Sequence, residues 1–171
     1  MKVRWILPKR KNWPNRFSMK SSAEIKLLAY ERLSEAEILC NAGKYDGAFY
    51  LAGYSIELML KAKVCAQLGV DNLFDEGCKF SGINEVRRAV KTHDITALFI
   101  FSGLREKFEN AKNLSSVLER TNARLFLASG HSLWSEQIRY QSVGSQNSDN
   151  VQALIALLNH EEGLLKWIDK S

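Results

Sequence analysis

The segment between Gly43 and Gly69 constrains the fold more than any other part of this chain. It contains no proline, and apolar residues cover most of the circumference of the helix that it would form. A helix this apolar belongs at the centre of a helical domain, because its surface must be buried on several sides. The sequence therefore predicts one long central helix over residues 45–68, ending at Gly69.

Four polar side chains nevertheless share one face of this central helix, at steps of four, three and four residues. These stripe residues are Tyr50, Tyr54, Glu57 and Lys61. Polar groups on a central helix must be satisfied inside the protein or used for binding. Glu57 and Lys61 can form a simple ion pair, or Glu57 can hydrogen bond to Arg139 or Tyr140 and lock a later loop onto the helix. The functional alternative is that Lys61 faces the phosphate of a nucleotide or RNA.

Hydrophobic periodicity along the rest of the chain predicts only helices, and no strand-type alternation persists. The further expected helices cover residues 22–40, 84–90, 95–110, 114–128 and 148–168. Ser21 or Ser22 is expected to cap the first of these helices, and Gly43 to end it in the left-handed conformation. Residues 70–82 and 129–147 are expected to be loops. The sequence thus predicts an all-α domain over residues 21–171, a four-to-five-helix up-down bundle.

Residues 1–20 differ in charge from the rest of the chain. They hold seven of the 24 basic residues and none of the 19 acidic ones, so the remainder carries a formal charge of −2. Trp5, Trp13 and Phe17 interleave with these charges, a pattern that suits stacking on bases and pairing with phosphates. The segment can equally dock on a protein or be an idle tail. We treat it as a basic N-terminal arm and expect the body to fold without it.

Cysteine usage and hydropathy indicate a cytoplasmic protein. The three cysteines are an odd number and form no CxxC pair, which argues against a disulfide framework or a zinc site. No apolar run approaches the ~18 residues of a membrane span, and the first residues do not resemble a signal peptide. We therefore expect no membrane association, no metal site and no cofactor.

Three separated segments resemble the signature segments of HEPN domains, the "higher eukaryotes and prokaryotes nucleotide-binding" family. They are the run Gly43-Lys-Tyr-Asp-Gly-Ala-Phe-Tyr-Leu-Ala-Gly-Tyr-Ser-Ile-Glu-Leu-Met-Leu-Lys-Ala62, the run Lys91-Thr-His-Asp-Ile-Thr-Ala-Leu98 and the run Trp134-Ser-Glu-Gln-Ile-Arg-Tyr140. The resemblance implies a helical bundle that forms a homodimer and binds RNA or nucleotides in a prokaryotic toxin–antitoxin or antiviral defence module. Some members of this family are metal-independent ribonucleases. Others are non-catalytic interaction subunits, often paired with a nucleotidyltransferase.

The resemblance also implies candidate catalytic residues, because ribonuclease members carry an arginine and a later histidine with four to six residues between them. One fit here is Arg88-Ala-Val-Lys-Thr-His93, which lies earlier in the chain than in those members. His93 could serve as a general base on a ribose 2′-hydroxyl, since histidine titrates near neutrality. Arg88 could bind the phosphate through its fork of donors. The alternative is that His93 and Asp94 only cap a helix.

The candidate RNA- or nucleotide-binding residues are Tyr54, Glu57, Lys61, Arg139 and Tyr140. Arg139 and Tyr140 can bind a phosphate and stack a base, or can instead anchor their loop. A two-fold dimer would bring the 88–94 segments or the 134–140 segments together, with Trp134, Arg139 and Tyr140 as interface anchors. His131 and His160 have no partners at metal-ligand spacing.

Overall fold

The computed structural model describes residues 21–171, and all of their regular structure is helical. In chain order the helices are α1 (Ser22–Asn41), α2 (Tyr45–Leu68), α3 (Ile83–Val90), α4 (Ile95–Phe101), α5 (Arg105–Lys112), α6 (Ser116–Leu125), the short 3₁₀-helix η1 (Glu136–Tyr140), α7 (Ser148–Asn159) and α8 (Leu164–Lys170). The described residues form no strand, only an isolated bridge between Phe126 and Ser132. The predicted all-α class is therefore confirmed. The basic arm, residues 1–20, lies outside the described residues.

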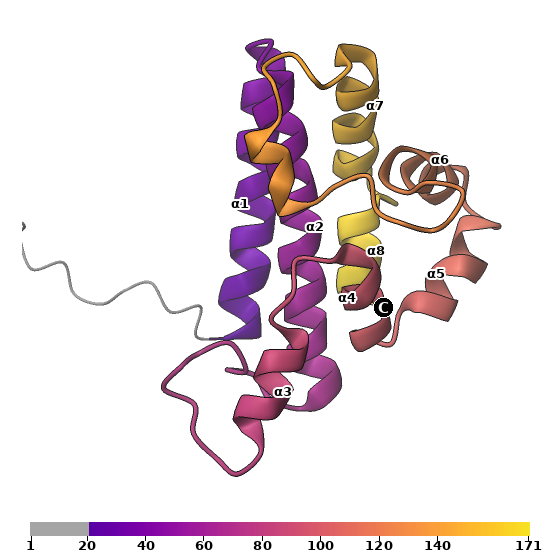
Figure 1. The fold of residues 1–171 in the computed structure, drawn as a ribbon. Helices are drawn as coiled ribbons and strands as arrows, with labels where there is room; N and C mark the ends of the chain where they lie inside the picture. The colour runs from indigo at the N-terminus through magenta and orange to yellow at the C-terminus, as the bar shows by residue number, and fades with distance from the viewer. Residues whose placement is uncertain (1–20) are drawn as a thin grey trace, which may run out of the picture.

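Helices α1 and α2 form an antiparallel hairpin whose ends match the sequence prediction (Figure 1). Ser21 caps α1 in a capping box, because its side chain accepts from the Glu24 backbone while the Glu24 carboxylate accepts from the Ser21 backbone. Gly43, with φ of 71°, turns the chain between the two helices, and Gly69, with φ of 67°, ends α2. Both turns use the left-handed conformation that glycine adopts without steric cost.

Helix α2 is the centre of the bundle, as its composition predicts. It contacts α1, α4, α7, α8 and η1, and all but one residue of the stretch 55–65 is buried. From the sequence we expect Leu51, Ser55, Leu58 and Ala62 to face the core. Ser55, Leu58 and Ala62 are buried, whereas Leu51 is only partly buried.

Two helices predicted as continuous are broken. The helix expected over residues 95–110 divides into α4 and α5 at Gly103, whose φ of 69° cannot continue a helix. The last helix divides into α7 and α8, which follow one another along the side of α2 (Figure 1). An ideal Cβ on Gly163 would lie 2.5 Å from the Leu157 carbonyl oxygen, so the chain turns there too tightly for a side chain. The expectation of four or five helices was therefore wrong in number, since the bundle is built from shorter segments.

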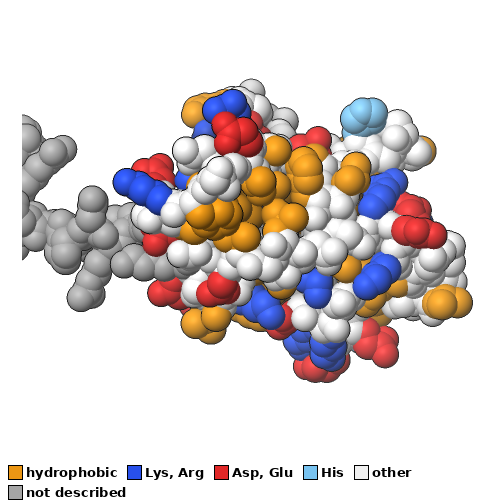
Figure 2. Space-filling model, turned by 90° about the horizontal axis from the view of Figure 1, so that it is seen from below, with side chains coloured by type: hydrophobic (Ala, Val, Ile, Leu, Met, Phe, Trp, Pro, Cys, Tyr) orange, Lys and Arg blue, Asp and Glu red, His pale blue; other side chains and the backbone are white. Residues whose placement is uncertain are grey.

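Exposed apolar side chains gather at the end of the molecule where α2 and α4 finish. Figure 2, which views this end, shows hydrophobic atoms on the surface among charged ones. Leu68 from α2 and Ile100 and Phe101 from α4 are exposed, and the two helix ends are neighbours because the Gln67 side chain lies against Gly103. No helix within residues 21–171 has the length and apolar character needed to cross a membrane.

Candidate functional site

The stripe on α2 lies on one face of the helix, as predicted. The rings of Tyr50 and Tyr54 stack with centroids 6.4 Å apart. One turn further on, the Lys61 ammonium lies 2.5 Å from a carboxylate oxygen of Glu57, and both side chains are buried. The i,i+4 ion pair considered from the sequence is therefore present, and it is an interior pair.

The remaining partner of Glu57 is His93, from the segment between α3 and α4. The His93 Nδ1 lies 3.0 and 3.1 Å from the two carboxylate oxygens. The prediction that Glu57 accepts a hydrogen bond from Arg139 or Tyr140 is wrong. The Arg139 side chain interacts instead with Tyr50 and Tyr140, and Tyr50 lies two turns, about 10 Å, away from Glu57 along α2.

The contact with Glu57 orients the His93 ring. Beside the Lys61 ammonium the carboxylate is an acceptor, so Nδ1 of His93 donates to it. In the neutral ring, the other nitrogen, Nε2, then carries the lone pair. The His93 side chain is 52% exposed, whereas the Glu57 side chain is only 1% exposed. A buried carboxylate therefore holds a surface imidazole in the tautomer that can accept a proton.

His93 stands between two cavities and lines both. The smaller, of about 210 Å³, is lined by Tyr54, Glu57, Leu58, Lys61, Phe74, Glu76, Arg87, Lys91 and His93. The larger, of about 530 Å³, is lined by Thr92, His93, Asp94, Thr96, Arg105, Ser129, Gly130, His131, Ser132, Trp134, Ser135 and Glu136. Burial and then the nearby Glu57 carboxylate raise the pKa of the Tyr54 phenol, which therefore remains a neutral hydrogen-bond donor.

Arg88 is not brought to His93 within one chain. Its side chain is exposed on α3 and lines neither cavity. The preceding residue, Arg87, faces inward and donates to the carbonyl oxygens of Leu73, Asp75 and Cys78 at 2.8–2.9 Å. Because successive helical residues point about 100° apart, the arginine that meets the His93 cavity is the one that holds the 70–82 loop in place.

The predicted binding residues fall into two groups. Tyr54, Glu57 and Lys61 lie with His93, whereas Arg139 and Tyr140 lie with Tyr50 near the start of α2. The Arg139 guanidinium lies over the Tyr140 ring, 5.0 Å from its centroid, and both residues are exposed.

Trp134 anchors the 129–147 segment to α2 rather than serving an interface. It is 2% exposed, and its indole Nε1 donates to the Tyr50 carbonyl oxygen at 2.9 Å. Its ring fills the space above Gly53, where an ideal Cβ would lie 2.1 Å from the indole. The expectation that Trp134 anchors a dimer is therefore wrong, because its own chain already buries it.

Sequence reasoning missed two residues of the larger cavity, Arg105 and His131. His131 was considered only as a metal ligand, and Arg105 was not singled out. His131 follows Gly130, whose carbonyl oxygen accepts from the Thr96 hydroxyl at 3.3 Å. The Arg105 guanidinium lies beside Gly130. No spacing rule links these residues to His93, since only the fold joins the start of α4 to the 129–136 segment. Within residues 21–171, no three His, Cys, Asp or Glu side chains could together hold a metal ion.

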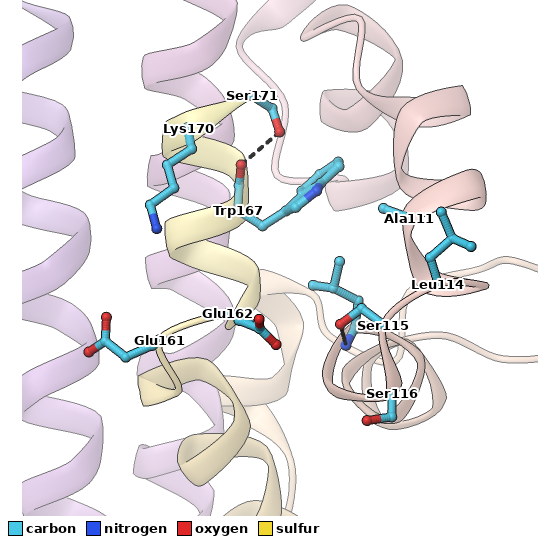
Figure 3. A pocket seen from close by; sticks show the side chains of 10 residues that line it. Ala111, Leu114, Ser115, Ser116, Glu161, Glu162, Trp167, Lys170 and Ser171 are labelled. Carbon is cyan, nitrogen blue, oxygen red and sulfur yellow. Dashed lines mark hydrogen bonds between the residues drawn. The ribbon is translucent and has the colours of Figure 1, made fainter.

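A third cavity, of about 570 Å³, lies between α8 and the turn before α6. Figure 3 shows the Trp167 indole pointing from α8 toward Ala111 and Leu114 across this space. None of the candidate catalytic or binding residues predicted from the sequence lines this third cavity.

Comparison of the chain with protein-family models, curated proteins and solved structures finds no match. The resemblance to HEPN domains therefore stays a prediction, and the functional argument depends on the geometry around His93.

Proposed function

We propose that this protein binds RNA at the two cavities beside His93 and cleaves the RNA backbone without a metal ion. One observation carries the proposal: the buried Glu57 carboxylate holds Nδ1 of a surface histidine. A histidine with a purely structural role does not need to be exposed to solvent. The His93 imidazole is instead half exposed and lines two cavities.

In the proposed reaction His93 Nε2 removes the proton of a ribose 2′-hydroxyl. The 2′-oxygen then attacks the adjacent phosphorus, and the bond from phosphorus to the 5′-oxygen breaks. The departing 5′-oxygen takes up a proton from an acid in the site or from water, so the products are a 2′,3′-cyclic phosphate and a 5′-hydroxyl. Glu57 stabilises the imidazolium that forms, because its carboxylate already bonds the opposite ring nitrogen.

The other candidate binding residues have auxiliary roles in this proposal. Lys61 and Tyr54 line the smaller cavity with His93, so they are the candidates to meet a nucleotide there. Arg139 and Tyr140 would stack and pair with a more distant part of the RNA. Arg88 is exposed on α3, so it could reach a phosphate at this site only in the homodimer that the HEPN resemblance implies.

The same resemblance supplies the biological setting. We propose a toxin–antitoxin or defence module, with an antitoxin or a nucleotidyltransferase as the protein partner. The seven basic residues of the arm would add phosphate contacts, and their contribution to RNA affinity should fall as salt rises.

The test is cleavage of a structured RNA by the purified full chain in the presence of a metal chelator. His93→Ala should lower the rate at least ~100-fold, the usual contribution of a general base. His160→Ala is the matched control, because His160 is exposed and lines neither cavity. An RNA with 2′-deoxyribose at the cleaved position should resist the wild type. Equal rates for His93→Ala and wild type would refute the proposal.

A second candidate function is a non-catalytic interaction subunit. The exposed Leu68, Ile100 and Phe101 at one end of the bundle favour it, because apolar residues grouped on a surface are typical of protein-binding sites. Light scattering of wild type and of the double variant Ile100→Glu, Phe101→Glu tests whether this end joins two copies. A dimer that becomes monomeric, in a protein that leaves RNA intact, would select this function.

A further inference from the structure

The larger cavity beside His93 contains a second histidine, His131, held on a rigid turn. The Leu127 amide donates to the His131 carbonyl oxygen at 2.9 Å, and the Gly130 amide donates to the Leu127 carbonyl oxygen at 2.8 Å. The Trp134 side chain then fixes the chain three residues further on. The backbone of His131 is therefore positioned by the fold, while its side chain is exposed at the cavity.

The two imidazoles differ in what bonds their Nδ1 atoms. The Glu57 carboxylate can only accept, which leaves His93 Nε2 as a proton acceptor. His131 Nδ1 lies 3.0 Å from the Ser129 hydroxyl, which can donate or accept. The Ser129 hydroxyl can therefore donate to Nδ1 of His131 when that nitrogen is unprotonated and accept from it when it is protonated. His131 Nε2 can carry a proton toward the cavity without losing its partner.

The other charged side chains that line this cavity already have interaction partners. Arg105 lies beside the His131 turn and pairs with Glu109 at 3.0 Å. Asp94 caps α4 by accepting from the Thr96 and Ala97 amides. A hydrogen bond from Gln137, with smaller effects that include the charge of His93, lowers the pKa of the Glu136 carboxyl. The guanidinium and two imidazoles thus face two carboxylates. When one imidazole is protonated, the two positive charges balance the two carboxylates, so the net charge of the lining does not repel an anionic phosphate.

From this arrangement we infer that His131 is the general acid of the reaction for which His93 is the base. The inference rests on the proposed RNA cleavage. His93 Nε2 takes the 2′-hydroxyl proton as the bond from the 2′-oxygen to phosphorus forms. His131 Nε2–H gives its proton to the 5′-oxygen as the bond from phosphorus to that oxygen breaks. One proton is taken and one is given, and exchange with solvent restores both side chains.

Two substrates that differ in their leaving group test this role. A dinucleotide has a poor alkoxide leaving group that needs protonation, whereas uridine 3′-(4-nitrophenyl phosphate) releases a stable phenolate that does not. His131→Ala should lower cleavage of the dinucleotide ~100-fold or more and change release of nitrophenolate only a few-fold. His93→Ala should lower both rates, and His160→Ala neither. Thermal unfolding of each variant checks that it is folded, as we expect for exposed positions.

Each outcome decides the inference. If wild type cleaves the dinucleotide and His131→Ala cleaves it equally well, the proposed function stands and the role of His131 is refuted. If His131→Ala loses both substrates to the same extent, His131 is not the general acid. If wild type cleaves neither substrate, the proposed function fails and the inference fails with it.

Discussion

Two segments of this protein attach to the same face of α2 in opposite ways. The 91–94 segment is held by a polar contact, in which surface His93 reaches the buried Glu57–Lys61 pair. The 129–147 segment is held by packing, in which the indole of Trp134 fills the space above Gly53. The indole of the packed contact is almost fully buried, although Trp134 also lines the larger cavity. The polar contact opens on two cavities.

This difference separates the residues that build the site from those that work in it. A buried tryptophan on a helical glycine stabilises the loop and offers no group to a ligand. Burying a carboxylate costs free energy. Here the buried carboxylate of Glu57 bonds the half-exposed imidazole of His93. Trp134 therefore positions the cavity wall, and Glu57 orients the imidazole of His93.

Removing the packing of Trp134 on Gly53 should have the largest effect on the free energy of unfolding. Trp134→Ala should lower the free energy of unfolding by about 4 kcal/mol, the usual cost of deleting a buried aromatic side chain. Urea denaturation followed by circular dichroism measures it. Trp134→Phe is the control, since it keeps most of the volume but loses the hydrogen bond to the Tyr50 carbonyl oxygen, which contributes about 1 kcal/mol. A cost below about 1 kcal/mol for Trp134→Ala would show that this attachment does not depend on packing.

A slightly smaller effect should follow from breaking the polar contact. Lys61→Met leaves the Glu57 carboxylate buried without its ammonium, which costs about 3 kcal/mol. We place the effect at the lower end of the usual range because His93 still bonds Glu57. The double variant Glu57→Leu, Lys61→Met removes both charges and should be markedly more stable than Lys61→Met alone. Additive losses in this double-mutant cycle would show that the pair does not interact.

The hairpin of α1 and α2 could be predicted from sequence because its signals are local. Ser21 and Glu24 form the capping box, and Gly43 and Gly69 end the two helices. The break at Gly103 has the same kind of signal, a glycine inside an apolar helical pattern, but such a residue is equally compatible with a continuous helix. Local patterns therefore predicted where helices exist better than where they are interrupted.

Only part of the candidate site could be predicted from local sequence patterns. His93, Glu57 and Lys61 could be singled out because one residue belongs to a short motif and the others to a stripe. Their mutual contact could not, since it depends on where the 91–94 segment crosses α2. His131 became a candidate only because the fold places its turn beside the start of α4. Gly53 was a usable signal, because a glycine within a buried helix indicates close approach of another group.

The smallest expected effect on stability concerns a third attachment, made by the charge of Asp46, which is partly exposed. Asp46, in the first turn of α2, accepts from the Gly144 amide at 2.7 Å and from the Gln146 amide at 2.9 Å. The hydrogen bond from Gly144 and then that from Gln146 lower the pKa of this carboxyl below its ordinary value of 3.8. A pKa lowered by folding stabilises the protein fully above the ordinary value, and the stabilisation is lost as pH falls through the folded-state value.

Asp46→Asn should therefore be less stable than wild type at pH 7, and the difference should vanish in acid well below the ordinary carboxyl pKa. Urea midpoints of both proteins across this range measure it, with Glu31→Gln as the control because Glu31 is an exposed carboxylate within α1. A small effect at Asp46 beside a large one at Trp134 would mean that packing holds this segment and the charge only orders its far end. If the stability difference between Asp46→Asn and wild type does not change with pH, the contribution of Asp46 comes from the shape of its side chain. Within the described residues, the polar attachment at Glu57 would then be the only one on α2 that depends on charge.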